Sequence, residues 1–192
     1  MQSFIYFPSI IYRDERPDFL EAASLVASSH LERLEQTERE FQAQSGLLND
    51  ELSIAPLREY ILTSTATALT EQGYNTSGVT FSCFLWAQET YFGGGFPSHV
   101  HPHSLMSGFY FIETQENGSF PVFEDPRPGR IMSGLPVVES INPTAATTHI
   151  HFNSVVPGTL LMTNSWLNHT LTTNYSEKTT RTLHFTVGAE GR

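Results

Sequence analysis

The sequence predicts a mainly β protein, a sandwich or jelly roll with two N-terminal helices packed on one face. Two observations predict this fold. Helical spacing of apolar residues is confined to the part of the chain before Gly73. After Gly73 the chain consists of short runs rich in Val, Phe, Thr and Tyr, separated by Gly, Pro and Asn. Many short strands at such even spacing are typical of a sandwich or jelly roll.

Two helices are predicted in the N-terminal part. The first covers residues 17–44, with Asp18 as its N-cap. The second covers residues 56–72, where Pro56 is a favourable residue for a first turn and Gly73 a stop. The predicted strands follow in chain order: 78–88, 105–113, 120–124, 134–140, 147–152, 158–163, 166–172 and 180–187.

Length and composition indicate one globular domain. A chain of 192 residues fits a single domain, with residues 1–75 as helical support and 76–192 as the jelly-roll core. With 39% hydrophobic and only 16% charged residues, the chain can form a packed core and is not expected to be disordered. The net charge of -10 argues against nucleic acid as a partner, because a phosphate-backbone binder needs a basic face.

The single cysteine bears on the compartment. Cys83 excludes an intrachain disulfide, which is compatible with a reducing compartment, and its apolar surroundings predict a buried, inert thiol. Residues 1–8 lack the basic and apolar regions of a signal peptide. No apolar stretch reaches the roughly 18 residues that span a bilayer. We therefore expect a cytoplasmic protein with no membrane partner.

Seven of the eight histidines fall in the β part of the chain, and a pair of them has the spacing of metal ligands. His99 and His101 are two residues apart, so on an extended strand both imidazoles point the same way. The approach through residues 93–95, all glycine, and Pro97 is irregular, as at the rim of a barrel. This pair therefore predicts a metal site.

A third imidazole can come from a distant strand. His169 has the same parity as Leu167 and Leu171, so we expect it to point inward. An inward histidine needs either a hydrogen-bond partner or a metal. Its position on an antiparallel strand would bring it across from His99, which makes it a candidate third ligand.

The remaining histidines of the β part are weaker candidates. His103 has the parity of the pair, but the preceding proline bends the chain, so a substrate-facing role competes with ligation. His149 and His151 form a second pair, for which a solvent-facing edge strand is the favoured interpretation. His184 alternates with Thr182 and Thr186 and is expected on a polar outer face as a non-ligand.

Arg181 is a second anomaly of the last predicted strand. It shares a face with Leu183 and Phe185, and a guanidinium on an apolar face is costly unless a carboxylate pairs with it. The partner could be an acid of the protein, which would make a structural salt bridge, or a bound dicarboxylate co-substrate. Because Arg181 follows His169 by twelve residues, the sequence favours the co-substrate.

Four stretches of the chain carry a family resemblance, and they span nearly its whole length: residues 7–12, 86–112, 123–127 and 157–181. In this order they resemble the 2-oxoglutarate and iron(II)-dependent oxygenase superfamily, nearest to a branch of small oxygenases related to the prolyl-4-hydroxylase type of marine bacteria and phages. The resemblance implies a double-stranded β-helix (jelly roll) with iron at its open end. It also implies Fe(II) and 2-oxoglutarate as cofactors, and hydroxylation of a substrate with release of succinate and CO2.

Carried over by position, His99 and His169 look like the two histidine ligands and Arg181 like the 2-oxoglutarate anchor. The superfamily's first motif usually reads His-x-Asp or His-x-Glu, whereas here the acid position holds His101. We therefore expect the three-histidine set of His99, His101 and His169. A carboxylate ligand would complete a facial triad, and three imidazoles leave the iron more positive.

No substitute for the missing acid is evident in the sequence. His30-Leu31-Glu32 lies in a helical segment, where positions two apart project about 200° from each other. Asp125 belongs to an Asp-Pro-Arg-Pro-Gly stretch that first predicts a turn.

Two further positions are candidates for the co-substrate pocket. The family's Trp-x-Asn reads Trp86-Ala87-Gln88 here, which leaves a contact from Gln88 open. Tyr110 could contribute a hydroxyl, and a core aromatic is an equal alternative.

The substrate is expected to be a small molecule or a peptide, and a homodimer is left open. Two other functions remain alternatives. One is a cupin-like three-histidine metal oxygenase without a 2-oxo acid, in which Arg181 would bind the substrate's own carboxylate. The other is a non-catalytic jelly-roll binding module, in which the histidines need bind no metal.

Overall fold

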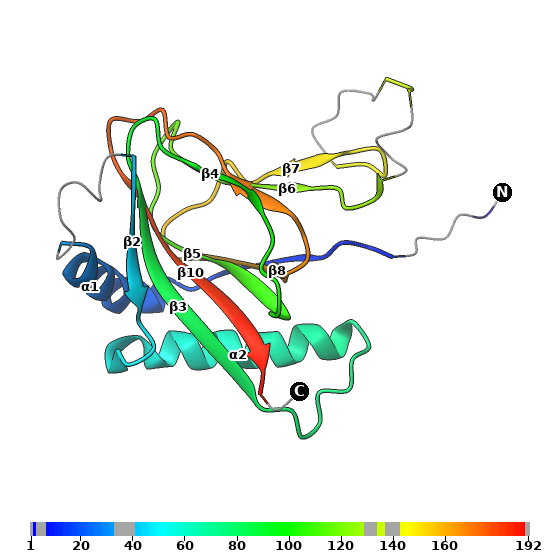
Figure 1. The fold of residues 1–192 in the computed structure, drawn as a ribbon, viewed down its shortest axis with the longest axis horizontal. Coiled ribbons are helices and arrows are strands. Elements are labelled where there is room, and N and C mark those ends of the chain that lie inside the picture. Colours follow the sequence, from blue (N-terminus) through cyan, green and yellow to red (C-terminus); the bar gives the residue numbers. More distant parts are fainter. Residues whose placement is uncertain (1, 3–6, 33–40, 129–133, 137–142, 191–192) are drawn as a thin grey trace.

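Two antiparallel sheets face each other in the computed structural model (Figure 1). The structure describes residues 2, 7–32, 41–128, 134–136 and 143–190. The larger sheet has the order β1-β8-β5-β10-β3-β2 and the smaller β4-β9-β6-β7. The strands are β1 (Ile11–Glu15), β2 (Gln42–Leu47), β3 (Phe81–Thr90), β4 (Phe96–His99), β5 (Met106–Glu113), β6 (Pro121–Glu124), β7 (His149–His151), β8 (Thr159–Asn164), β9 (His169–Leu171) and β10 (Thr180–Ala189).

From β3 onward the chain crosses repeatedly between the two sheets. Strands β3, β5, β8 and β10 lie in the larger sheet, while β4, β6, β7 and β9 lie in the smaller one. All the strand pairs are antiparallel. This alternation is the connectivity of a double-stranded β-helix, so the predicted jelly roll is confirmed.

The two helices cover the outer face of the larger sheet (Figure 1): α1 (Leu20–Leu31) and α2 (Ala55–Glu71). Short 3₁₀ turns, Pro17–Phe19 and Leu52–Ile54, precede them. In α2 the buried residues Leu57, Ile61, Ala68 and Leu69 fall on one side of the helix. Gly73, at φ +92°, ends the helix as predicted, because that backbone conformation suits glycine.

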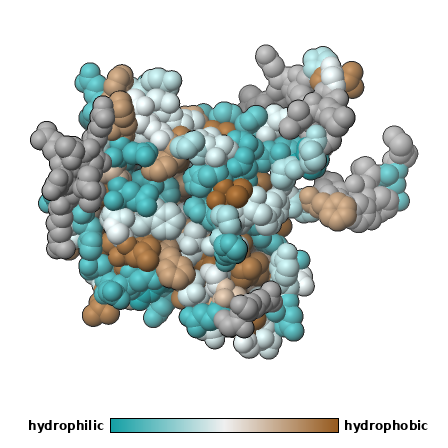
Figure 2. All heavy atoms as spheres, in the orientation of Figure 1, coloured by the Kyte–Doolittle hydropathy of each residue, from teal (hydrophilic) through white to brown (hydrophobic). Residues whose placement is uncertain are grey.

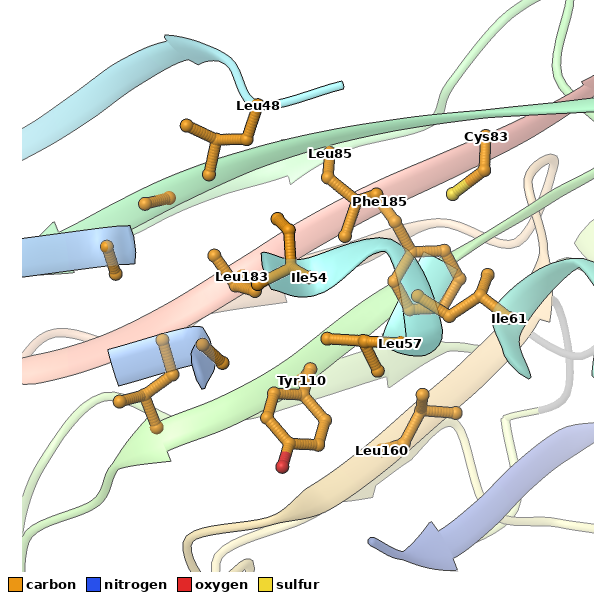
Figure 3. Close-up of a cluster of buried hydrophobic side chains, with 14 of the residues drawn as sticks. Leu48, Ile54, Leu57, Ile61, Cys83, Leu85, Tyr110, Leu160, Leu183 and Phe185 are labelled. Carbon is orange, nitrogen blue, oxygen red and sulfur yellow. The ribbon is translucent and has the colours of Figure 1, made fainter. Parts of the chain in front are cut away.

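Both faces of the larger sheet are buried. On one face, Leu57 and Ile61 of α2 pack with Leu183 and Phe185 of β10 (Figure 3). On the other face, Phe109 and Leu161 pack against Phe123 and Leu171 of the smaller sheet. Burying such a side chain contributes about 1.5–3 kcal/mol, so both clusters hold the layers together.

This arrangement corrects the predicted orientation of His184. The face that His184 shares with Thr182 is the interior between the two sheets, and His184 is only 4% exposed. Leu183 and Phe185 face the helices instead. Alternation of polar and apolar residues marks inside and outside only where one face of a strand meets solvent.

The first helix is shorter than the sequence predicted. It ends at Leu31, residues 33–40 lie outside the described part of the chain, and residues 42–44 belong to strand β2. Asp18 does not cap the helix, because its carboxylate accepts hydrogen bonds from Arg16 at 3.0 and 2.6 Å.

The strand predictions differ most from the structure at the edges of the sheets. Strands β1, β2 and β4 were not predicted, and each lies at the edge of its sheet. A strand was predicted for residues 134–140, but residues 134–136 form none, and 137–140 lie outside the described part. Because β1 and β2 join the larger sheet, the N-terminal part is not only a helical support.

The surface view shows hydrophilic and hydrophobic residues interspersed over one face of the molecule (Figure 2). Among the described residues, no helix has the length and apolar character needed to cross a membrane. Cys83 is buried, as predicted, and burial raises the pKa of its thiol to about 12, so it is un-ionised at neutral pH.

Candidate metal centre

Three histidines meet where strands β4 and β9 pair. His99 is the last residue of β4 and lies directly opposite His169, the first residue of β9. His101 follows β4 by two residues, and its backbone N–H donates to the carbonyl oxygen of Ser165 at 3.0 Å. The pairing of the strand ends and this bond therefore bring residues 99, 101 and 169 together.

The three imidazoles form one compact cluster. One ring nitrogen from each of His99, His101 and His169 lies within 4.8 Å of the other two. The ring centroids are 4.5–5.2 Å apart. In the described ranges of the chain, this is the one group of three or more His, Cys, Asp or Glu that could hold a metal ion.

Backbone carbonyls orient two of the three rings. Nδ1 of His99 lies 2.8 Å from the carbonyl oxygen of Pro97, and Nδ1 of His169 lies 2.9 Å from that of Leu167. A carbonyl oxygen only accepts, so Nδ1 is the donor in both rings. This tautomer leaves each Nε2 with a free lone pair, as a metal ligand requires.

Burial keeps two of the three rings uncharged. It is the main cause, with repulsion from the neighbouring imidazoles, that lowers the pKa of both His101 and His169 to about 4. At neutral pH both rings are therefore unprotonated and able to donate a lone pair. Three clustered imidazoles, two of them oriented by backbone carbonyls, suit Fe(II), Zn(II) or Cu(II), so the residues present fit an iron ion.

Glu124 fastens the two ligand-bearing segments to each other. Its carboxylate accepts hydrogen bonds from Ser98 Oγ at 2.5 Å and from Asn168 Nδ2 at 2.7 Å, the residues that precede His99 and His169. The sequence analysis missed Glu124, because Ser98 and Asn168 become its neighbours only through the pairing of β9 with β4 and β6.

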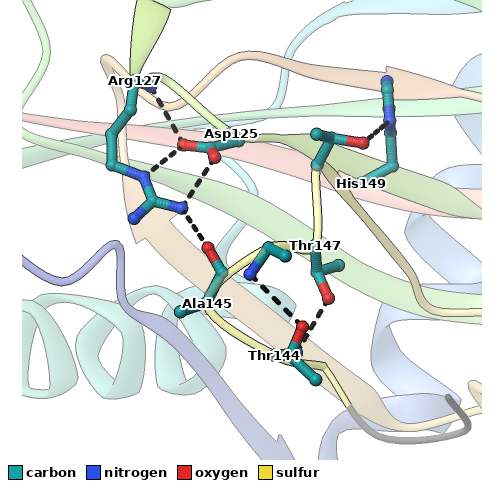
Figure 4. A network of polar contacts seen from close by, with 8 residues as sticks. Asp125, Arg127, Thr144, Ala145, Thr147 and His149 are labelled. Carbon is teal, nitrogen blue, oxygen red and sulfur yellow. Dashed lines mark hydrogen bonds and ion pairs between the residues drawn. The ribbon is translucent and has the colours of Figure 1, made fainter. Parts of the chain in front are cut away.

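Asp125, considered in the sequence analysis as a substitute acid, is engaged elsewhere. Its carboxylate accepts hydrogen bonds from the backbone N–H, Nε and a terminal nitrogen of Arg127 at 2.8–3.0 Å (Figure 4). Arg127 also donates to the carbonyl oxygen of Ala145 at 2.9 Å. The carboxylate of Asp125 therefore stabilises the turn through Arg127, and it is not a member of the histidine cluster.

Arg181 is paired with acids of the protein. Its guanidinium donates to Glu89, to Glu113 at 2.9 Å and to Ser28 Oγ of α1 at 2.9 Å. The contact with α1 places Arg181 on the helix-covered side of the larger sheet. The structure thus matches the salt-bridge alternative and does not bring Arg181 to the histidine cluster.

Tyr110 also lies on the helix side of the sheet. Its ring is fully buried in the core beside Leu57, and its hydroxyl donates to the carbonyl oxygen of Arg16 at 2.6 Å (Figure 3). Burial is the main cause that raises its pKa to about 12. The structure therefore matches the core-aromatic alternative for Tyr110.

Gln88 lies in the interior, opposite Thr182 on the same face as His184. The side-chain nitrogens Gln88 Nε2 and His184 Nε2 are buried, and neither has a hydrogen-bond partner among the described residues. The hydroxyls of Ser107 and Ser165 are in the same state. The sequence missed His184 because its polar neighbours suggested an outer face.

The other histidines of the β part lie outside the cluster. His103 is exposed and has a positive φ of 67°. His149 and His151 are exposed on β7, an edge strand of the smaller sheet, as predicted.

Comparison with known proteins gives one family match. The model of a family described as "Putative 2OG-Fe(II) oxygenase" matches residues 84–186, which is more than half of the chain and includes the three histidines. None of the curated proteins matches this chain in sequence.

Solved structures share the fold. A prolyl-4-hydroxylase from Pseudomonas putida aligns with a TM-score of 0.62 and 10% identity, covering 95% of this chain and 94% of that one. HygX from Streptomyces hygroscopicus, with nickel and 2-oxoglutarate bound, aligns with a TM-score of 0.56 and 11% identity, covering 95% and 84%. SnoN, a non-haem α-ketoglutarate-dependent epimerase of nogalamycin biosynthesis, aligns with a TM-score of 0.64 and 8% identity, covering 94% and 76%.

Proposed function

This chain belongs to the 2OG-Fe(II) oxygenase family that its residues 84–186 match, and we propose that it is an iron(II)- and 2-oxoglutarate-dependent dioxygenase. The proposed reaction hydroxylates a small molecule or a peptide and releases succinate and CO2. The observation that carries the proposal is the cluster of His99, His101 and His169, three imidazoles held within 4.8 Å of one another at the pairing of β4 and β9.

Each part of the site has a defined task in this proposal. Iron(II), when bound with 2-oxoglutarate and dioxygen, supplies the oxidising power for attack on a C–H bond. The protein supplies two neutral ligands, because burial keeps the imidazoles of His101 and His169 unprotonated. The carbonyls of Pro97 and Leu167 hold two rings in the ligating tautomer.

Aromatic rings pack against two of the histidines. Trp86 lies 6.1 Å from the ring of His101, and Phe109 and Phe123 lie 5.5 and 5.9 Å from that of His169. His169 is only 1% exposed, whereas His99 and His101 are partly exposed, so the cluster has a dry side and an open side.

A groove offers room for the substrate. Its volume is about 350 Å³, which is within the range of small-molecule sites. Phe123, which contacts His169, lies in its wall together with Glu124 and Asp125. We therefore propose that the substrate approaches the centre along this groove.

The missing carboxylate favours a second candidate function. A three-histidine centre can serve an oxygenase that uses no 2-oxo acid, and the described cluster contains no Asp or Glu. The similar SnoN structure is an α-ketoglutarate-dependent epimerase. A 2-oxoglutarate-dependent reaction other than hydroxylation is therefore a variant of the first proposal.

The first experiment is an anaerobic titration of the iron(II)-loaded protein with 2-oxoglutarate, followed by visible absorption. We expect a weak charge-transfer band that grows with the 2-oxo acid in the wild type and is absent in His169→Ala. His151→Ala is the matched control, because His151 is an exposed histidine outside the cluster and should leave the band unchanged.

Two other results would contradict the proposal. Bound iron without a band, and without succinate in the presence of dioxygen, would favour the three-histidine oxygenase that needs no 2-oxo acid. A protein that binds no iron would instead favour the jelly-roll binding module.

Several further features are predicted from the sequence alone. An anchor role for Arg181 requires its guanidinium to exchange Glu89 or Glu113 for the ligand. The cytoplasmic location, the absence of nucleic acid and membrane partners, and a homodimer are also predictions. Light scattering coupled to gel filtration would measure the oligomeric state.

A further inference from the structure

We propose that two uncharged hydrogen-bond donors of the barrel interior, Gln88 Nε2 and His184 Nε2, receive the second carboxylate of the 2-oxo acid. Arg181 would then be a structural residue. This inference rests on the proposed function, and it names the residues that would select a dicarboxylate at the same site.

The first argument is that both nitrogens lack a partner. Gln88 is 1% and His184 is 4% exposed, yet neither Nε2 has a hydrogen-bond partner among the described residues. Buried polar groups are nearly always paired, because an unpaired one loses its hydration without compensation. Gln88 Nε2 is always a donor, and His184 Nε2 is one in its Nε2–H tautomer, so an acidic ligand would supply the acceptor that both lack.

The second argument is their position beside the histidine cluster. Trp86 lies directly opposite His184, and its ring contacts both His184 at 5.6 Å and His101 at 6.1 Å. On the other side, Phe109 contacts both His184 at 4.8 Å and His169 at 5.5 Å. A single aromatic ring therefore lies between His184 and each of two proposed iron ligands, His101 and His169.

Gln88 lies on the same interior face of the larger sheet as His184. It lies two residues after Trp86 on β3 and opposite Thr182, so its side chain shares the interior face with His184. Gln88 and His184 thus belong to neighbouring rows of the same sheet face, about 7 Å apart along the strands. That span suits a ligand that reaches from the histidine cluster towards Gln88.

The third argument is the charge of the complete site. In a facial triad, one carboxylate ligand and a doubly charged 2-oxo acid together exceed the charge of Fe(II) by one, and a cationic anchor balances that excess. With three neutral imidazoles, the doubly charged acid alone balances Fe(II). A buried site without excess negative charge needs no arginine to balance it. The replacement of the acid ligand by His101 is therefore consistent with neutral donors, and no cation, at the second carboxylate.

The fourth argument is that Arg181 is already satisfied. It donates to Glu89, Glu113 and Ser28, and the carboxylate of Glu89 also accepts from the hydroxyl of Tyr91 at 2.5 Å. Binding an acid at Arg181 would require breaking this network, whereas Gln88 and His184 are available without any loss.

The test measures binding of 2-oxoglutarate to the anaerobic iron(II)-loaded protein by calorimetry. The comparison ligand is 2-oxopentanoate, which has the same carbon chain but a methyl group in place of the second carboxylate. In Gln88→Met and in His184→Phe we expect affinity for 2-oxoglutarate to fall at least tenfold, with little change for 2-oxopentanoate. Both variants keep the shape of the side chain and remove the donor.

Stability provides an independent readout. Because each variant removes an unpaired buried polar group, its melting temperature in the absence of ligand should equal or exceed that of the wild type. A residue with a merely structural role would lower the melting temperature and leave the preference between the two acids unchanged.

Two controls separate the alternatives. Ser107→Ala removes another unpaired polar atom, opposite Thr186 on the far side of the His184 row, and should leave both affinities unchanged. The double variant Glu89→Gln/Arg181→Gln removes the guanidinium without leaving Glu89 charged, and it should bind 2-oxoglutarate like the wild type.

Three results would overturn the inference. Loss of 2-oxoglutarate binding in the double variant, with Gln88→Met and His184→Phe unaffected, would make Arg181 the anchor. Loss in Ser107→Ala would place the acid at the opposite end of the interior. An iron-loaded wild type that binds no 2-oxoglutarate would overturn the proposed function along with the inference, and the wild-type titration alone identifies that case.

Discussion

Two residues of the cluster, the partly exposed His101 and the buried His169, have a strongly lowered pKa. Burial is the main cause in both, and it lowers each pKa to about 4. Burial also lowers the pKa of His184 well below its usual value. These side chains must therefore lose their proton before they can occupy the folded interior, which couples folding to pH.

We predict that the metal-free protein loses stability as the pH falls from about 6.5 towards 4. In the unfolded chain these histidines become protonated near pH 6.5, whereas in the folded chain they stay neutral down to about pH 4. Above pH 6.5 they are neutral in both states, so they should cause no change in the free energy of unfolding there. Urea unfolding at pH 7 and at pH 4.5 would measure the difference.

The control for this pH effect is His169→Phe, which fills the pocket beside Phe109 and Phe123 without a titrating group. Its stability should fall less over the same pH range. An equal fall in the variant and the wild type would show that other groups cause the loss.

Residue spacing made the three histidines candidates, and the family resemblance selected them as a set. His99 and His101 are two apart, and His169 shares the parity of buried leucines. The partners of Arg181 could not be predicted in the same way. Glu89 and Glu113 become its neighbours only through the register of β10 with β3 and β5.

At the scale of the element, β10 explains where the sequence pattern misled. The strand is covered by helices on one face and by the smaller sheet on the other. Its alternation of Thr and His with Leu and Phe therefore distinguishes two buried layers, of which the more polar one contains the site.

The ion pair of Arg181 joins β10 to both of its neighbouring strands. We predict that Arg181→Leu lowers the free energy of unfolding by about 3 kcal/mol, because Glu89 would keep an unpaired charge at a side-chain exposure of 7%. Urea unfolding measures this loss. Adding Glu89→Gln to the variant should recover part of it, and no recovery would mean that the loss has another origin.

Gly108 sits where β5 passes between β8 and β10. A Cβ atom there would lie 2.0 Å from the carbonyl oxygen of Leu161 and 2.6 Å from the ring of Phe185. We therefore predict that Gly108→Ala destabilises the protein by about 3 kcal/mol or prevents folding, since the strands would have to separate. Thermal unfolding would measure the effect.

Gly46→Ala is the matched substitution in β2, because nothing lies within 4 Å of its Cβ position. It should change stability by no more than about 0.5 kcal/mol. Similar effects of the two substitutions would contradict the steric explanation for Gly108.

At the scale of the molecule, the sequence predicted every inner strand and one edge strand, β7, and missed the other three edge strands. The three unpredicted strands, β1, β2 and β4, all lie at sheet edges. Edge strands carry polar residues or proline, which limit further pairing, and so lack the apolar pattern that identifies a strand. Their assignment depends on the partner strand and could not come from their own residues.

The cluster also bears on the stability of the whole fold, because its ligands come from two segments far apart in the chain. We predict that Mn(II), a divalent ion that resists oxidation, raises the melting temperature. At a concentration 100 times its Kd, an ion that binds only the folded state adds about 2.7 kcal/mol, or about 5–10 °C for a protein of this size. Differential scanning fluorimetry would measure the shift.

His169→Ala is the control for this prediction, and it should show no shift with Mn(II). A shift of equal size in the variant would mean that the ion binds elsewhere.

The carbonyl groups that hold His99 and His169 have a consequence for how such a site can change over time. Pro97 and Leu167 contribute only main-chain oxygen atoms, each two residues before the ring that it orients. No amino-acid replacement can delete a main-chain oxygen. The ring orientation can therefore persist while almost every surrounding side chain drifts, as long as the two strand ends keep their path. A search for distant relatives of this protein should therefore compare the strand geometry around paired histidines, because sequence similarity is lost before this geometry is.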